Sequence, residues 1–503
     1  MGIELINRVT GTLRPTNHPY MNGPWTPNFE EYNATDMEVI GKIPEDIDGV
    51  YIRNTENPVH HAIGRYHPFD GDGMLHAIRM HGGKAEYRNR FVRTKGFLAE
   101  QEAGHALWAG LMEDPRKSLR PGWCAQGGLK DSSSTDVIVH AGMILSTFYQ
   151  SGEGYRLDPF TLEQTGTEGW VPIDGISAHT KLDEATGELL FFNYSKHAPY
   201  MHYGVVNRVN QLVHCVPIPL PGPRLPHDMA FTKNYSILND FPLFWDEELL
   251  KKGIHVVRFH PNIPSRFAIV PRYGSTDDIK WFEAAPTFVL HWLNAYEEGD
   301  EIVLDGYFED DPQPKSHPDA PEGYERMMAY LDQSLIKPRL HRWRFNLKTG
   351  KTTEQRLDNR DLEFGMFNQK YAGRKYRYAY SAIPKPGWFM FTGLVKHDLD
   401  TGTSVSVSLG EDRYASESPF VPRLNAKDED DGYLISFVTD MKANRSECIL
   451  IDAKNFEAGP VCRIFLPHRI SCGTHSTWAN AADIRADRDA IAKAAAEAAK
   501  AAA

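Results

Sequence analysis

The chain has few cysteines and no long hydrophobic run. Its 503 residues include five cysteines, namely Cys124, Cys215, Cys448, Cys462 and Cys472, and no two of them form a CxxC pair. An odd, scattered set opposes a disulfide framework and is typical of free thiols in a reducing compartment. No apolar run approaches the length of a transmembrane helix, and the first twenty residues contain no secretory-type apolar stretch. We therefore expect a cytoplasmic protein with no transmembrane segment.

The chain also lacks a positive charge excess. It has 55 Lys and Arg residues against 67 Asp and Glu residues, which gives a formal net charge of −12. This balance, and the absence of a basic stripe, exclude a partner bound through nucleic-acid phosphates. Hydrophobic residues make up 41% of the chain and charged residues 24%, which are values typical of a globular protein with a sizeable core.

Short β-type runs dominate what is present. They are rich in Val, Ile, Phe and Tyr, and Asp/Gly/Asn turns such as "LDEATGE" and "HDLDTGT" separate them. Many short strands with recurrent tight turns over so long a chain favour an all-β propeller over a sandwich. The clearest runs are residues 136–149, 187–195, 300–308, 432–440 and 447–453.

Helical segments are few. Residues 245–253 and 323–336 have helix-forming composition and are expected to lie in insertions between strands. Residues 481–503 are rich in Ala, Lys and Glu without a clear apolar face, which predicts a helical or disordered surface tail. Because linkers of the multidomain type are absent, we interpret residues 1–480 as a single domain.

Four histidines lie at the edges of strand-like runs, far apart in the sequence. They are His179 in "DGISAHTKLD", His227 in "RLPHDMAF", His291 in "TFVLHWLNAY" and His475 in "CGTHSTWA". The innermost strands of a propeller surround a central channel, so single residues from different blades can meet there. Four imidazoles at that point would form a nitrogen-only metal site.

The residue type alone leaves the metal and the ligand set open. Imidazole suits Fe, Zn, Cu and Ni, and a single histidine is more often a hydrogen-bonded structural residue than a ligand. The chain has 21 histidines, and several others compete for the same role. These competitors are His60, His61, His67, His76, His197 and His202.

Motifs along nearly the whole chain resemble those of the carotenoid oxygenase family, which includes carotenoid cleavage dioxygenases and lignostilbene dioxygenases. "GVYIRNTENPV" is similar to the family's Arg-Asn-Gly-Pro-Asn-Pro segment, with Thr55-Glu56 as a departure. "YHPFDGDGMLHAIRM" is a strong match, and "SAHTKLD", "HDMAFTKNYSI" and "GTHSTW" continue the register. So many motifs in order are far more specific than a lone "GDGML".

The resemblance implies a seven-bladed β-propeller with a helical or loop cap over its top face. It implies Fe(II) on the axis, held by His179, His227, His291 and His475, and use of O2 to cleave a conjugated carbon–carbon double bond into two carbonyl products. The implied partners are O2 and a small hydrophobic alkene, and the oligomeric state stays open.

The resemblance also implies carboxylates that accept from the outer nitrogens of the ligand histidines. Glu363 in "DLEFGMFN" and Glu417 in "ASESPFVPR" match two of them. The third position holds Gln150, a departure that keeps an acceptor oxygen but removes the charge, with Glu153 as a weaker candidate.

The substrate is the least specified feature. Stilbene cleavers of the family hold the phenol with a Tyr and a Lys, and here Tyr149 stands at the position of that Lys. Leu290 replaces the aromatic residue that is frequent before the third histidine, which suggests a less stacked wall over the iron. The Tyr149 hydroxyl could bind a 4-hydroxyl group of a substrate, and no apolar helix is evident that would enter a membrane to extract carotenoids. We therefore favour a phenylpropenoid or stilbene aryl-alkene, such as 4-vinylguaiacol or isoeugenol cleaved to vanillin, with apocarotenoid or carotenoid cleavage as the alternative.

Rival classes remain at this point. A non-catalytic propeller that binds proteins would have the same strand pattern but no purpose for four histidines. A propeller hydrolase with axial calcium would need oxygen ligands. An isomerase is possible within the same family, and only the cleaving enzyme should consume O2 in proportion to the aldehyde formed.

Overall fold

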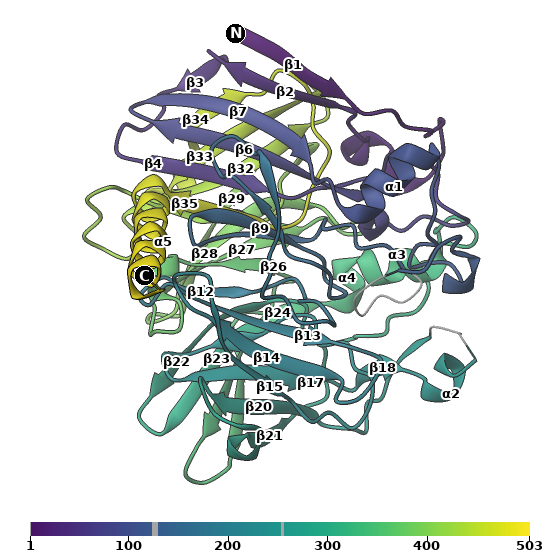
Figure 1. Ribbon diagram of the computed structural model, residues 1–503, viewed down its shortest axis with the longest axis vertical. Helices are drawn as coiled ribbons and strands as arrows, with labels where there is room; N and C mark the ends of the chain where they lie inside the picture. The colour runs from purple at the N-terminus through teal and green to yellow at the C-terminus, as the bar shows by residue number, and fades with distance from the viewer. Residues whose placement is uncertain (1, 123–128, 253–255, 503) are drawn as a thin grey trace.

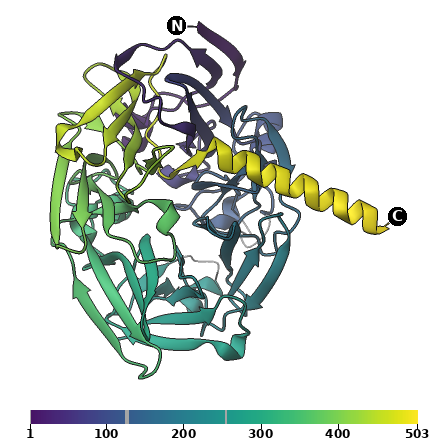
Figure 2. The ribbon, with the colours of Figure 1, turned by 90° about the vertical axis from the view of Figure 1, so that its left-hand side faces the viewer.

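The computed structural model describes residues 2–122, 129–252 and 256–502. In this part of the chain, antiparallel sheets are arranged around a common centre, which confirms the predicted all-β propeller (Figures 1 and 2). Helices are short and few apart from the one at the C-terminal end. Middle strands such as β13 are buried along almost their whole length. In outer strands such as β15, by contrast, exposed side chains alternate with half-buried ones over most of the strand. This explains why the continuous apolar runs in the sequence are middle strands.

Five sheets have four strands each, and most of them are simple meanders in chain order. The first consists of β8 (Asp136–His140), β9 (Met143–Thr147), β10 (Tyr155–Leu157) and β11 (Gln164–Thr167). The second has β12 (Lys181–Asp183), β13 (Glu188–Tyr194), β14 (Met201–Val206) and β15 (Leu212–Pro217). The third has β16 (Ala230–Phe231), β17 (Tyr235–Asp240), β20 (Ser265–Pro271) and β21 (Lys280–Ala284). The fourth has β22 (Trp292–Glu298), β23 (Glu301–Glu309), β24 (Pro338–Asn346) and β25 (Thr352–Arg356). The fifth has β26 (Glu363–Met366), β27 (Tyr378–Pro384), β28 (Phe391–Asp398) and β29 (Thr403–Ser408).

Two larger sheets join the beginning of the chain to its end. One has seven strands, in which C-terminal β35 pairs with N-terminal β4, and the other has six, in which β3 pairs with β34. These pairings close the ring without a covalent link. The seven-stranded sheet contains β1 (Gly2–Arg8), β2 (Glu30–Thr35), β4 (Asp48–Arg53), β5 (Glu56–Asn57), β6 (Asp72–His81), β7 (Lys84–Phe91) and β35 (Ser476–Asn480). The six-stranded sheet contains β3 (Val39–Gly41), β30 (Arg413–Tyr414), β31 (Phe420–Pro422), β32 (Gly432–Asp440), β33 (Arg445–Asp452) and β34 (Pro460–Phe465).

The insertions between strands gather on one side of the ring and form a cap (Figure 1). It contains four short helices and the two-stranded sheet of β18 and β19. The described parts of both segments predicted to be helical, 245–253 and 323–336, lie here. The cap elements are α1 (Lys95–Ala103), α2 (Glu247–Leu250), α3 (Glu325–Leu331), α4 (Gln333–Ile336), β18 (Leu243–Trp245) and β19 (Val257–Phe259).

The C-terminal segment is the helix α5 (Ala481–Ala502), which crosses the face of the ring opposite the cap (Figure 2). Its first turns pack on the propeller through buried Ala481 and Ile484. Arg488 anchors it further, because its Nη2 lies 2.7 Å from Asp158 Oδ2. Beyond this point the side chains are mostly exposed. Among the described residues, no helix combines the length and the apolar character needed to cross a bilayer.

Candidate metal centre and substrate cavity

The strands at the inner edges of four sheets are each preceded by one histidine. His291 and His475 come directly before β22 and β35, while His179 and His227 come two and three residues before β12 and β16. A strand that starts at the centre of a propeller directs the residues before it onto the axis. The four predicted histidines therefore meet although up to 296 positions separate them in the sequence.

The other three sheets of four or more strands, which contain β8, β26 and β31, each place a carboxylate at the centre in the same way. Asp136 begins β8, Glu363 begins β26, and Glu417 lies three residues before β31. Each of these strands lies at the edge of its sheet or beside that edge. The centre is thus surrounded by imidazoles and by carboxylates.

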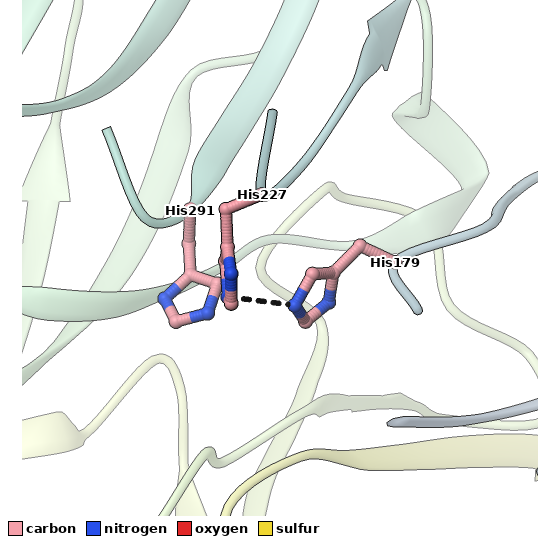
Figure 3. Close-up of side chains that lie close together, drawn as sticks. All are labelled: His179, His227 and His291. Carbon is pink, nitrogen blue, oxygen red and sulfur yellow. Dashed lines mark hydrogen bonds between the residues drawn. The ribbon is translucent and has the colours of Figure 1, made fainter. Parts of the chain in front are cut away.

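The imidazoles of His179, His227 and His291 lie close together and face one another (Figure 3). His179 Nε2 lies 3.1 Å from His227 Nε2, and one nitrogen of His291 lies within 4.8 Å of both residues' ligand atoms. His475 completes the cluster, with its ring centroid 4.5 Å from that of His179 and 4.7 Å from that of His291. None of the six competing histidines belongs to a possible metal-binding group among the described residues.

Three of these histidines are oriented by a carboxylate on the outer nitrogen. His291 Nδ1 lies 2.6 Å from Glu363 Oε2, and His475 Nδ1 lies 3.4 Å from Glu417 Oε1. Glu363 and Glu417, the two glutamates expected beside the histidines, thus each contact one histidine of the cluster. An acceptor at Nδ1 places the proton there and leaves Nε2 as the free lone pair, which is the arrangement of metal-ligating histidines.

The third such carboxylate is Asp136, which the sequence reasoning missed. Its Oδ2 lies 2.9 Å from His179 Nδ1 and accepts from the His179 backbone N–H at 3.1 Å. The available signal was its position at the start of the strand-like run 136–149, close to the place where each histidine precedes its own strand. His179 itself has a φ of 59°, a left-handed conformation that is costly for a residue with a side chain and typical of functional sites.

Within the described part of the chain, Gln150 forms no hydrogen bond with a histidine of the cluster. Its amide nitrogen donates to the Tyr149 hydroxyl at 2.9 Å. Glu153, the weaker candidate, is engaged elsewhere, since it forms an ion pair with Lys95 and accepts from the Tyr155 hydroxyl at 2.9 Å.

Burial and mutual repulsion keep three of the imidazoles neutral. The pKa values of His179, His227 and His291 are held well below the ordinary value, first by burial and then by neighbouring histidines. His291 Nε2 is buried with no hydrogen-bond partner in the described structure. A buried lone pair without a donor is costly unless something else binds it.

The carboxylates favour a positive charge at the centre. Burial lowers the pKa of His475, but the carboxylates of Glu417, Asp136 and Glu56 outweigh this and raise that pKa to about 9. Burial raises the pKa of Glu363 to about 8. Both pKa values are thus shifted towards the protonated form, so the electrostatics of the centre favour added positive charge. A divalent cation bound at the Nε2 atoms would supply the same charge, so the residues present fit a metal ion.

A cavity of about 580 Å³ lies between the cap and this centre. His227, His291 and His475 form its floor, and apolar side chains form most of its walls. Tyr149 and Leu290, the two residues predicted for the substrate pocket, both line it. Its cap-side wall includes Leu243, Trp245, Met327, Leu331 and Ile336. A second cavity, of about 410 Å³, reaches the histidines from the side of α5.

The protein is thus an all-β propeller with a cluster of imidazoles at its centre and a capped apolar cavity above them. These features define a class of propellers with a candidate metal centre built from nitrogen ligands. A family model described as retinal pigment epithelial membrane protein matches residues 25–480. Carotenoid 9,10(9',10')-cleavage dioxygenase 1 of Arabidopsis thaliana is 32% identical, over 91% of this chain and 89% of that protein. Isoeugenol monooxygenase of Pseudomonas putida is 30% identical, over 92% and 98%.

Solved structures agree with these relatives. The crystal structure of Pseudomonas brassicacearum lignostilbene dioxygenase superposes with a TM-score of 0.81 and 26% identity, covering 93% of this chain and all of that one. The chain belongs to the carotenoid oxygenase family that this model describes. By class it is an alkene-cleaving dioxygenase.

Proposed function

We propose that His179, His227, His291 and His475 hold one Fe2+ through their Nε2 atoms. The observation that carries this is the convergence of four imidazoles, of which His227 is half-buried and the other three are buried. Asp136, Glu363 and Glu417 anchor those three at Nδ1. Imidazole also suits other divalent metals. Iron is favoured because the reaction class requires a metal that can react with O2.

The proposed reaction adds both atoms of O2 across one alkene. The carbon–carbon double bond breaks, each carbon gains one oxygen atom, and two carbonyl compounds leave without an external reductant. Bound iron would supply the one-electron chemistry that lets O2 react with a closed-shell alkene. The chain itself would exclude water with the apolar cavity, place the double bond over the histidines and favour the neutral imidazoles of His179, His227 and His291.

The substrate that we favour is an aryl-alkene of the phenylpropenoid or stilbene type. The cavity is mostly apolar, and Tyr149 lines it with its ring 6.0 Å from that of His227. The Tyr149 hydroxyl accepts from the Gln150 amide and keeps its own proton to donate to a substrate phenol. The relative named isoeugenol monooxygenase also supports this choice. An apocarotenoid is the second candidate, and the relatives named carotenoid cleavage dioxygenases support it equally.

The test is anaerobic loading with Fe2+, followed by air and a panel of 4-vinylguaiacol, isoeugenol, resveratrol and an apocarotenal, with O2 uptake and aldehydes measured together. We expect vanillin from the first two substrates, with one O2 consumed per alkene cleaved. Shortened apocarotenals alone would assign the chain to the second candidate. Bound iron without O2 uptake on any substrate would contradict a cleaving enzyme.

We also propose that each sheet of four or more strands is one blade, which retains the sequence expectation of seven blades. Support comes from the seven inner strands, each of which brings one imidazole or carboxylate to the centre. Residues 1–480 would form the single domain and 481–503 an appended tail. Among the described cysteines, Cys215, Cys448, Cys462 and Cys472 are free thiols, which fits a cytoplasmic location.

A further inference from the structure

A buried carboxylate lies between the segments that contain three of the four histidines. Asp228 follows His227 directly and is 1% exposed. Its Oδ2 accepts from the backbone N–H of Trp292 at 2.8 Å. Trp292 follows His291 directly and begins β22, whereas Asp228 lies two residues before β16. This hydrogen bond therefore joins the segments of two histidines that belong to different sheets.

The other oxygen of Asp228 contacts a third segment. Its Oδ1 lies 2.7 Å from Lys181 Nζ and accepts from the Met229 N–H, also at 2.7 Å. Lys181 begins β12, two residues after His179. One carboxylate thus contacts three segments at the inner edges of three sheets, and these segments contain the three histidines drawn in Figure 3.

His227 is the histidine for which such an anchor matters most. The other three histidines of the cluster each have a carboxylate at Nδ1. In the described part of the chain, no carboxylate forms a hydrogen bond or ion pair with the ring of His227, whose Nε2 lies beside that of His179. The adjacent Asp228 instead fixes the backbone, because its carboxylate accepts from Trp292 and its carbonyl oxygen accepts from Asn239 Nδ2 at 2.7 Å.

The pairing of Asp228 with Lys181 also balances charge near the centre. Both residues line the second cavity together with His179, His291 and His475. The Lys181 side chain is 26% exposed and that of Asp228 is 1% exposed, so the carboxylate is removed from water. A buried carboxylate is stable as an ion only when a cation or N–H groups pair with it. An ammonium without a counter-charge would repel a metal ion at the histidines.

We propose that Asp228 is a positioning residue that, paired with Lys181, fixes the spacing of His179, His227 and His291 before a metal binds. The inference rests on the proposed metal site and adds a residue that acts on it through backbone N–H groups and a lysine rather than through an imidazole ring. Ligands held at the correct spacing by such contacts bind a metal more tightly, because binding no longer has to order them.

The test compares metal affinity and ligand geometry in Asp228 variants. Asp228→Asn keeps the shape, but its NH2 group must face the N–H of Trp292, the N–H of Met229 or the ammonium of Lys181. Fe2+ affinity is measured anaerobically by competition with a chelator, and the d–d absorption bands of bound Co2+ report the geometry of the ligands. We expect binding weakened by about 10–100-fold and shifted Co2+ bands. Asp228→Ala, which removes all three contacts, should have at least the same effect, and wild-type affinity with unchanged bands in either folded variant would overturn the proposal.

The matched control is Asp305→Asn. Asp305 is also fully buried, and its carboxylate accepts from Arg342 and from the Tyr376 hydroxyl, but it lines neither cavity at the centre. This variant should melt at a lower temperature than the wild type and yet keep its Fe2+ affinity and Co2+ bands. If Asp228→Asn behaved in the same way, the role of Asp228 would be structural only and the proposal would be wrong.

A double variant separates position from charge. Asp228→Asn alone leaves the Lys181 ammonium unbalanced, which by itself weakens the binding of a cation. Combining Asp228→Asn with Lys181→Met removes both charges. If Asp228 positions the ligands, the double variant should still bind Fe2+ about tenfold or more weakly and show shifted Co2+ bands. Recovery of wild-type affinity and bands would reduce Asp228 to a counter-charge and overturn the proposal. A wild type that binds neither metal would instead contradict the proposed function, and the positioning role with it.

Discussion

Replacing Asp136 with Asn tests the part of the site that the sequence did not reveal. Asp136 Oδ2 accepts from both the backbone N–H and Nδ1 of His179, while Oδ1 accepts from the Val137 N–H at 2.7 Å. An asparagine has only one acceptor oxygen. Its NH2 group must therefore face either the two N–H groups of His179 or the N–H of Val137, and one contact becomes repulsive.

The expected result is weaker metal binding. Loss of a hydrogen-bond partner behind a metal-ligating histidine typically costs 10–100-fold in affinity. Because both the charge and one acceptor are lost here, we expect Asp136→Asn to weaken Fe2+ binding by about 100-fold, or about 2.7 kcal/mol. The affinity is measured anaerobically by competition with a chromogenic chelator, and circular dichroism verifies that the variant is folded.

The matched control is Asp358→Asn. Asp358 Oδ2 lies 3.0 Å from Nε2 of the buried His397, so this pair has the same chemistry away from the axis. Its replacement should leave the Fe2+ affinity unchanged. An Asp136→Asn variant that binds Fe2+ within threefold of the wild type would refute the view that this carboxylate orients a ligand.

Three further results are expected. Replacement of His227 by Ala should abolish bound iron and O2 uptake, whereas the same change at His397 should abolish neither; an active His227 variant would remove it from the ligand set. Gln150→Glu should leave iron bound within threefold, since the position contacts no ligand histidine, and loss of the metal would show that it does act on the site. Asp183 is buried in an ion pair with two arginines; burial raises its pKa, but the arginines outweigh this and lower it below the ordinary value. Its contribution to stability should thus be present above the unfolded pKa of about 3.9 and be lost as the pH falls through the lower folded value. Asp183→Asn should cost about 3–5 kcal/mol in urea unfolding at pH 7, with the difference shrinking below pH 4; a constant difference would contradict this assignment.

The sequence predicted the features that depend on local pattern. Apolar runs bounded by turn residues located middle strands such as β32, because strands buried on both faces are continuously apolar. The four histidines were found because each precedes a strand and matches a family motif. The two glutamates were found through the resemblance, which residue type alone could not have supplied.

Features that depend on contacts far apart in the chain were not predicted. The pairing of β35 with β4 joins the two ends of the protein, and no local signal specifies it. Asp136 was missed because a carboxylate at the start of a strand usually faces solvent. Gln150 was expected to hold a histidine, but its amide donates instead to the hydroxyl of the adjacent Tyr149.

The most direct test of the central claim is a crystal structure of the Fe2+-loaded protein, grown without oxygen, with anomalous data collected on both sides of the iron edge. We expect a single iron peak on the propeller axis, at bonding distance from the Nε2 atoms of His179, His227, His291 and His475. A peak bound by other residues, or a fully loaded protein with no peak among these four nitrogens, would contradict it.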